Sequence, residues 1–118
     1  MLKIYQCENC KKVIISKEAL KLEGWNELVA GSTDAAQEKH VPIVTKKCKT
    51  VVVDVGSIAH PMTEEHLIEW VALETEKGYQ VQYFNAGEAP MCAFKLADGD
   101  KAVAVYAYCN LHGLWTNA

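Results

Sequence analysis

The stretch ADGDKAVAVYAYC, residues 97–109, joins a turn signal to a strand signal. Asp98 and Gly99 form an Asp-Gly pair, which favours a tight hairpin turn. The nine residues that follow are mainly small apolar, β-branched or aromatic, which is typical of a strand buried in a sheet. This stretch therefore predicts an antiparallel β protein in which residues 101–109 form the last strand.

Five runs upstream have the same texture and are separated by turn segments such as TEKGY and NAGEAP. They are HVPIV (40–44), KTVVVDV (49–55), LIEWVALE (67–74), YQVQYF (79–84) and MCAFKLA (91–97). Short strands at this spacing indicate an all-β sandwich or barrel. The period of LIEWVALE is irregular, so a helix stays open there. STDAAQE (32–38) predicts one helical turn, with Ser32 to Asp34 as caps.

Composition limits the classes of function. A chain of 118 residues can bury a core without disulfides, and its net charge of −3 gives no basic footprint for nucleic acid. The start, MLKIYQCENC, turns polar after five residues, and no run is long enough to span a bilayer. We therefore expect no membrane or nucleic-acid partner and a cytoplasmic location. Five cysteines without an export signal indicate reduced thiols or metal ligands.

The four histidines occur at turns or predicted strand ends, and three of them lie close to a cysteine or to another histidine in sequence. His60 and His66 form a His-x5-His pair, His40 opens a predicted strand, and Cys109 with His112 forms a Cys-x2-His at the end of the last strand. Each histidine alone is an ordinary surface or core residue, but together they can converge at one end of a sandwich. Four imidazoles and one thiolate exceed the four ligands of a tetrahedral zinc and fit a five-coordinate iron better.

Three segments resemble the metal-binding segments of the superoxide reductase family, which includes neelaredoxin and desulfoferrodoxin. They are EKHVPIV, IAHPMTEEHLIEW and YCNLHGLW, and the resemblance covers residues 30–118 in the same order. It implies an immunoglobulin-like β-sandwich that reduces superoxide to hydrogen peroxide at one non-haem iron per chain, ferrous in the active form. By matching position, the iron ligands are four equatorial histidines and an axial thiolate, namely His40, His60, His66, His112 and Cys109.

The resemblance also implies roles for Glu38 and Lys39. The glutamate matches one that caps the ferric iron, and the lysine matches one that attracts superoxide and helps to protonate peroxide. In a regular strand these two neighbours face opposite ways, so both can serve one site only if residues 31–39 form a mobile loop. Two solvated charges are the alternative. The family further implies a small electron-donor protein, such as a rubredoxin, and a homo-oligomer, either dimer or tetramer.

The first thirty residues depart from the two-iron members of the family. Cys7 and Cys10 form a Cys-x2-Cys, but the segment expected to hold an adjacent cysteine pair reads NELVAGSTDAA. We therefore expect residues 1–30 to be a small β module with an incomplete site, and residues 31–118 to be the iron-binding domain. No second iron is expected within one chain, although a site shared by two subunits stays open. Cys48 and Cys92 are interpreted as buried small hydrophobes.

Other classes of function remain as alternatives. A blue-copper carrier also has Cys-x2-His on a late strand, but it uses two histidines and usually a methionine after the last one, and no methionine follows Cys109. A non-catalytic immunoglobulin-like module with a chance histidine cluster is a second alternative. A thiol hydrolase built on Cys109 and His112 lacks a third group to orient the histidine.

Overall fold

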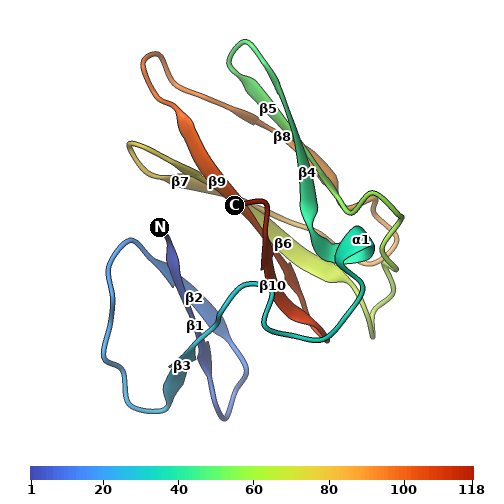
Figure 1. The fold of residues 1–118 in the computed structure, drawn as a ribbon. Helices are drawn as coiled ribbons and strands as arrows, with labels where there is room; N and C mark the ends of the chain where they lie inside the picture. Colours follow the sequence, from blue (N-terminus) through green and yellow to red (C-terminus); the bar gives the residue numbers. More distant parts are fainter.

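The computed structural model describes residues 1–118 and consists almost wholly of antiparallel strands (Figure 1). The strands are β1 (Lys3–Cys7), β2 (Val13–Ser16), β3 (Trp25–Glu27), β4 (Pro42–Lys47), β5 (Thr50–Val55), β6 (Ile68–Thr75), β7 (Tyr79–Tyr83), β8 (Met91–Lys95), β9 (Ala102–Cys109) and β10 (Gly113–Thr116). The one helix, α1 (Gln37–His40), is a single turn, and no helix in the chain is long and apolar enough to cross a bilayer.

Three sheets are stacked in layers. The four-stranded sheet β10-β9-β6-β7 packs against the three-stranded sheet β4-β5-β8 to form a sandwich. The N-terminal sheet β2-β1-β3 covers the outer face of the four-stranded sheet (Figure 1). All six strands expected from the sequence are present, including β6, so the all-β prediction is confirmed and the helix alternative for residues 67–74 is wrong.

Alternating side chains of β9 explain why this strand is buried on both faces. Val105 and Cys109 point into the sandwich core, whereas Tyr106 and Tyr108 point into a second core beneath the N-terminal sheet. Side chains on a strand alternate between faces, so a strand that is apolar at every position needs a cover on each side. The N-terminal residues Leu2 and Ile4 supply that second cover.

A buried carboxylate fastens the N-terminal module to the sandwich. Glu74, at the end of β6, is only 4% exposed. Its Oε1 accepts hydrogen bonds from the backbone N–H of Leu2 at 2.9 Å and from the Tyr106 hydroxyl at 3.1 Å. Lys17 Nζ lies 3.7 Å from its other oxygen. A buried charge is tolerated when it is paired and hydrogen-bonded in this way.

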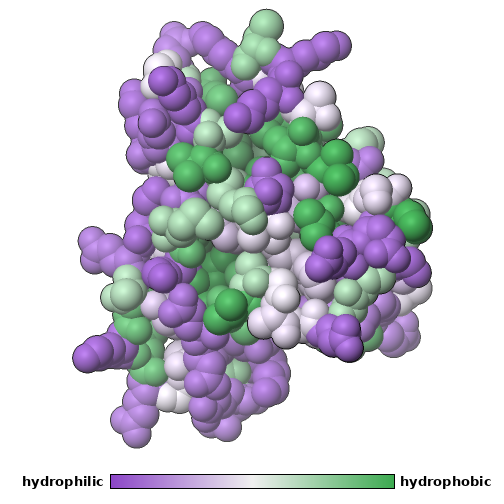
Figure 2. All heavy atoms as spheres, in the orientation of Figure 1, coloured by the Kyte–Doolittle hydropathy of each residue, from purple (hydrophilic) through white to green (hydrophobic).

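Apolar side chains reach the surface mainly near the middle of the face drawn in Figure 2, where green patches are surrounded by hydrophilic purple. The exposed apolar residues Ile43, Tyr83 and Met91 belong to strands of the sandwich. Single exposed apolar residues are normal on a folded protein, so these positions need no special explanation.

Three local expectations are wrong. The last strand is β10, which pairs with β9 after a short turn, not residues 101–109. The helical turn lies at residues 37–40, and its N-cap is Ala36, without a side-chain capping bond from Ser32 to Asp34. Cys48 is exposed in the turn between β4 and β5, where its φ of 54° is left-handed, so it is not a buried strand residue.

Candidate metal centre

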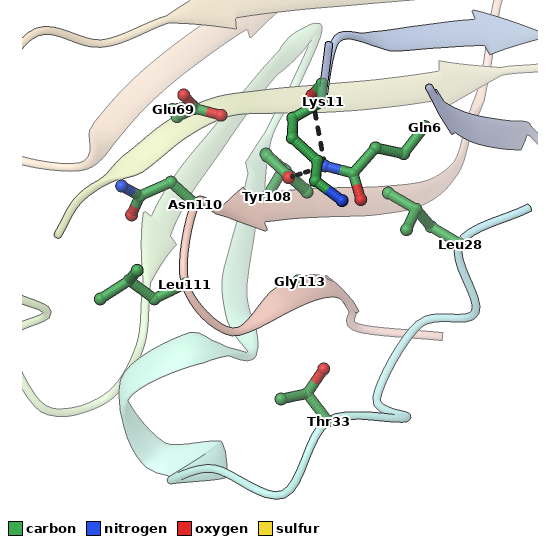
Figure 3. A pocket seen from close by; sticks show the side chains of 9 residues that line it. All are labelled: Gln6, Lys11, Leu28, Thr33, Glu69, Tyr108, Asn110, Leu111 and Gly113. Atoms are coloured by element: carbon green, nitrogen blue, oxygen red, sulfur yellow. Dashed lines mark hydrogen bonds between the residues drawn. The ribbon is translucent and has the colours of Figure 1, made fainter. Parts of the chain in front are cut away.

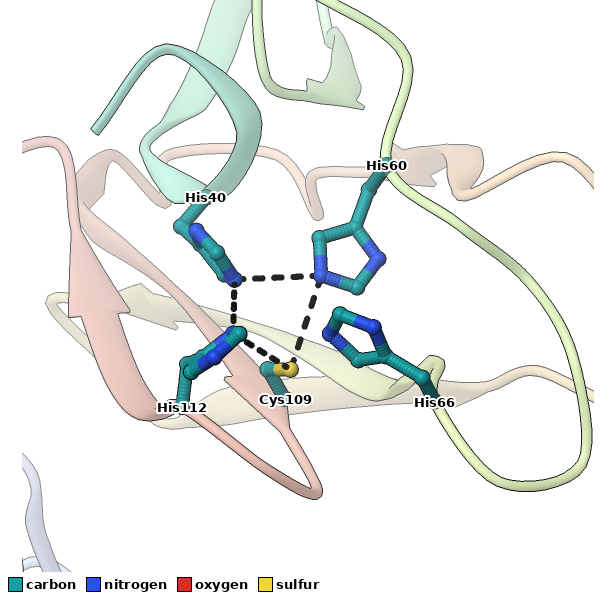
Figure 4. A group of neighbouring side chains, drawn as sticks. All are labelled: His40, His60, His66, Cys109 and His112. Atoms are coloured by element: carbon teal, nitrogen blue, oxygen red, sulfur yellow. Dashed lines mark hydrogen bonds between the residues drawn. The ribbon is translucent and has the colours of Figure 1, made fainter. Parts of the chain in front are cut away.

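Four histidine rings and one cysteine sulfur meet at one end of the sandwich (Figure 4). One potential ligand atom from each of the five residues lies within 4.8 Å of all the others. Neighbouring rings are arranged edge to face in a closed circuit. The ring centroids are 4.6 Å apart for His40 and His60, 4.7 Å for His60 and His66, 5.0 Å for His66 and His112, and 4.9 Å for His112 and His40. Cys109 lies beside this circuit, with Sγ 3.5 Å from His60 Nε2.

The five residues come from separate parts of the fold. His40 ends α1, His60 and His66 lie in the connection between β5 and β6, Cys109 ends β9, and His112 lies in the turn before β10. The sequence prediction that these residues converge is therefore confirmed as geometry. The expectation that His40 opens a strand is wrong. The chain makes one helical turn that ends at His40, and β4 begins only at Pro42.

Backbone carbonyls set the tautomers of two histidines. His40 Nδ1 lies 2.7 Å from the Ala36 carbonyl oxygen, and His60 Nδ1 lies 2.6 Å from that of Pro61. A carbonyl only accepts, so both Nδ1 atoms carry the proton, and both Nε2 atoms present a lone pair. These carbonyl bonds fix the orientation of each ring, as is usual for histidines that bind metals.

Three nitrogen atoms of the cluster are placed as ligands of one shared cation would be. The Nε2 atoms of His40 and His60 are 3.1 Å apart, yet two lone pairs cannot hydrogen-bond to each other. Nitrogens bound at right angles to one first-row metal, at about 2.0–2.1 Å, would themselves be about 3 Å apart. His66 Nε2 is buried without any hydrogen-bond partner, although buried polar atoms are nearly always paired. A shared metal ion would satisfy all three nitrogens.

Burial depresses the basicity of these imidazoles. Desolvation lowers the pKa of His60 to about 4 and also lowers the pKa of His40 and of His66. The neutral form of each ring is therefore favoured, and a metal binds the neutral form. His40 and His60 are 2% and 5% exposed, whereas His66 and His112 are partly exposed, so solvent reaches the cluster from the side of the latter two.

Cys109 is fully buried, and burial raises the pKa of its thiol. The backbone N–H groups of His112 and Leu111 point at the sulfur and oppose that effect. A cation beside the sulfur favours the thiolate strongly and would displace the proton.

Two residues that the sequence reading did not single out hold the cluster in place. Trp115 stacks on His40, with ring centroids 4.9 Å apart, and its Nε1–H donates to the His112 carbonyl oxygen at 3.0 Å. The Asn110 side chain accepts from the Leu67 N–H at 3.0 Å and donates to the Glu65 carbonyl at 2.9 Å. Trp115 and Asn110 both lie inside YCNLHGLW. The signal in the sequence was an aromatic or a polar residue close to the two ligands Cys109 and His112.

Glu38 and Lys39 lie directly before His40 in α1, not in an extended loop. The α1 turn is tied down by the β5–β6 connection, because the Ile58 N–H donates to the Glu38 carbonyl oxygen at 2.9 Å. Gly56 has a φ of 81°, and a Cβ there would lie 2.7 Å from the Lys39 carbonyl carbon, so only glycine permits this approach. Desolvation is the largest cause that lowers the pKa of His40 and of His66, and the other histidines come next. The Lys39 charge adds a smaller effect in the same direction, which indicates that it lies near the cluster.

The other four cysteines stay outside the cluster. Cys7 and Cys10 lie in the N-terminal module, Cys48 lies in the turn between β4 and β5, and Cys92 lies in β8. Cys92 is half-buried in β8 with a pKa raised to about 11 by burial, which matches a small apolar role. The site therefore has four imidazoles and one thiolate, twice the histidines that the blue-copper alternative requires.

A β-sandwich with a His4Cys cluster at one end, arranged so that it could hold a metal ion, defines the class of this protein. Residues 32–118 match the Desulfoferrodoxin family model. The chain is 38% identical to a desulfoferrodoxin of Syntrophotalea carbinolica over 98% of its own length and 95% of that protein. It is 35% identical to a superoxide reductase of Pyrococcus horikoshii, covering 73% of this chain and 90% of that one.

The fold agrees with these relatives. The crystal structure of the superoxide reductase from Treponema pallidum superposes with a TM-score of 0.82 at 38% identity, covering 89% of this chain and 93% of that one. The sandwich is accordingly the immunoglobulin-like one expected from the resemblance. The chain belongs to the desulfoferrodoxin family, whose members include superoxide reductases.

Proposed function

We propose that this protein is a superoxide reductase that converts superoxide to hydrogen peroxide at one iron per chain, ferrous in the active form. The observation that carries the proposal is the closed circuit of four histidine rings beside a buried cysteine (Figure 4). His40, His60, His66, His112 and Cys109 would hold the iron. When bound, ferrous iron supplies the single electron that superoxide takes up, and two protons complete the peroxide.

The donor set favours an anionic substrate. Four neutral imidazoles and one thiolate leave a ferrous ion with a formal charge of about +1, which attracts an anion such as superoxide. The Cys109 thiolate would donate electron density to a bound iron, as in thiolate-ligated haem proteins, and would so tune its reactivity. Access from the His66 and His112 side leaves the thiolate side closed, because Cys109 is completely buried.

Lys39 is proposed to steer superoxide and to help deliver protons to the product. Its position one residue before His40, and its influence on the neighbouring imidazoles, support this role. Glu38 is proposed to cap the oxidised centre. It is exposed in α1, so reaching the centre would need its side chain or the α1 turn to move.

We further propose that residues 31–118 form the iron-binding domain and that residues 1–30 form a small module with an incomplete site. The electron comes from a separate small carrier, such as a rubredoxin. We further propose a cytoplasmic location. We also propose a homo-oligomer, either dimer or tetramer, because exposed edge strands favour pairing between copies.

Metal analysis with visible spectra tests the proposal. We expect about one iron per chain and a thiolate-to-iron charge-transfer band that appears on oxidation and disappears on reduction. A permanent intense blue colour with copper would support an electron carrier instead. Protein that binds neither metal after reconstitution would support a non-catalytic module.

A further inference from the structure

The turn between β1 and β2 holds two cysteines in a compact loop. Cys7 ends β1, its N–H donates to the Lys12 carbonyl at 2.9 Å, and its carbonyl accepts from the Lys11 N–H at 3.1 Å. Lys11 has a left-handed φ of 61°, which closes the turn. The Cys10 N–H donates to Cys7 Sγ at 3.3 Å, so the second cysteine is folded back on the first.

Hydrogen bonds converge on the sulfur of Cys7. The Cys10 N–H donates to it at 3.3 Å, and the neighbouring Cys10 thiol and the Asn9 and Lys11 N–H groups also favour the thiolate, the Cys10 thiol most. Together they lower the pKa of Cys7, since a thiolate is stabilised by donors that point at it. Cys7 is partly exposed and Cys10 is exposed, so small reagents can reach both. A lowered pKa, exposure and an adjacent second thiol are the features of reactive Cys-x2-Cys pairs.

The same pair lacks the partners of a metal site within the chain. The cluster at His40 is the only place where three or more His, Cys, Asp or Glu ligands gather, and it includes neither cysteine. Glu8, between them in sequence, is engaged with the Asn26 amide at 3.1 Å. A closed tetrahedral thiolate site needs four ligands, and this loop supplies two.

The loop is also tied to the metal end of the sandwich. The Gln6 amide donates to the Lys11 carbonyl at 3.2 Å and to the Tyr108 hydroxyl at 3.0 Å, and Tyr108 precedes the proposed axial Cys109 (Figure 3). These residues line a hollow of about 470 Å³ that opens beside Asn110. Peroxide from the proposed iron centre would form on the same chain as the two thiols.

We propose that Cys7 and Cys10 form a redox-active dithiol that hydrogen peroxide converts to an intrachain disulfide. The Cys7 thiolate attacks one peroxide oxygen, the O–O bond breaks, and the leaving hydroxide takes a proton to give water. The Cys10 sulfur then attacks the Cys7 sulfenic acid; an S–S bond forms, the S–OH bond breaks, and the second water leaves with the Cys10 proton. Two thiols lose two electrons and peroxide gains them. A thiol reductant returns the pair to the dithiol and itself becomes a disulfide.

Only the source of the peroxide rests on the proposed function, so the test adds peroxide directly. The iron-loaded chain is treated with one equivalent of hydrogen peroxide and then alkylated, and its peptides are weighed. Cys48 is a matched internal control, because it is also exposed but lies alone in the β4–β5 turn. We expect residues 4–11 to lose two hydrogen atoms and resist alkylation, with Cys48 oxidised about tenfold more slowly. Treatment with dithiothreitol should restore both thiols.

Single variants separate the two sulfurs. In Cys10→Ser, Cys7 should stop at the sulfenic acid, which a 1,3-diketone reagent traps, whereas Cys7→Ser should react no faster than Cys48. Equal oxidation of all exposed cysteines in the parent would overturn the proposal. The proposal would also be overturned if the parent bound more iron or zinc than the His4Cys centre can hold and if Cys7→Ser lost this extra metal. The pair would then be half of a metal site shared by two chains. A chain that fails to reduce superoxide but forms the disulfide would sink only the proposed function.

Discussion

The chain directs backbone N–H groups at a cysteine sulfur in two separate turns, and the surroundings give the two sulfurs different chemistry. The Cys109 side chain is buried and faces four imidazoles, whereas Cys7 is partly exposed and faces a second thiol. The local motif is similar in both places, Cys-x2-His in one and Cys-x2-Cys in the other. The short motif therefore places N–H groups that favour a thiolate. The residues that surround the sulfur in the folded chain then decide whether it binds metal or reacts.

Replacing the buried sulfur should have the largest effect. In Cys109→Ser a hydroxyl takes the place of the thiolate and is a harder, weaker donor, so we expect iron affinity to fall by more than about 100-fold and the oxidised-state colour to disappear. Iron content and visible spectra of the purified variant check this. Cys92→Ser is the matched control, since it removes a half-buried thiol that packs against the same core as Cys109. A Cys109→Ser protein with full colour and activity would show that the axial assignment is wrong.

The buried imidazoles should make the iron-free protein sensitive to acid. Burial lowers the pKa of His60 from 6.5 to about 4, so the unfolded chain takes up the proton first as pH falls. Stability is then complete above about pH 6.5 and declines towards pH 4, by about 3 kcal/mol at most from this residue.

Denaturant unfolding of the iron-free protein at several pH values measures this decline. His60→Leu, which cannot titrate at this position, should show a shallower dependence between pH 6.5 and pH 4. Identical slopes in the parent and the variant would mean that His60 is not held neutral by the fold.

A surface charge beside the metal end should matter less than the ligands. At about 5 Å and an effective dielectric near 20, the Lys39 ammonium would attract an anion by roughly 3 kcal/mol before screening and motion reduce it. We expect Lys39→Ala to slow the reaction with superoxide by about tenfold and to flatten its dependence on ionic strength. Pulse-generated superoxide at several salt concentrations gives both quantities.

Two neighbours serve as controls for this experiment. Lys47→Ala removes an exposed lysine at the far end of β4 and should leave the rate within about twofold of the parent. Glu38→Ala should spare the rate and alter only the ferric spectrum and the late steps. If Lys39→Ala keeps the parent's rate and salt slope, Lys39 is an ordinary solvated charge.

The smallest effect on superoxide reduction is expected in the N-terminal turn. Changing both Cys7 and Cys10 to Ser should leave the rate and the iron content within about twofold of the parent, because neither residue lies in the His4Cys cluster. Stopped-flow kinetics and metal analysis test this. A loss of iron from the double variant would mean that the N-terminal turn binds metal, as the turn at Cys109 is proposed to do.

The regular parts of the sandwich could be predicted from the sequence because strand side chains alternate and β6 and β9 are apolar on both faces. The turn at Cys48 could not, since KKCKT carries none of the Gly or Asn signals of a two-residue turn. The place of the helical turn α1 was also hidden, because the turn is held by the backbone bond from the Ile58 N–H to the Glu38 carbonyl oxygen, twenty residues away in the chain.

The metal cluster was predictable in a different way. All four histidines and Cys109 lie in three segments that resemble one family, so their identity was readable even where the local structure around His40 was not. The supporting roles of Trp115 and Asn110 depend on side-chain packing and on hydrogen bonds to the β5–β6 connection. Such contacts join residues far apart in the chain, and a single sequence does not reveal them.

The stoichiometry of the reaction with superoxide tests the central claim most directly. Reduced, iron-loaded protein is mixed with a known amount of superoxide, and hydrogen peroxide and oxygen are both measured. A His4Cys centre that acts as a reductase should give one peroxide for each superoxide consumed, oxidise one iron for each peroxide, and release no oxygen. Release of one oxygen for every two superoxide ions, with the iron unchanged at the end, would show dismutation and contradict the account.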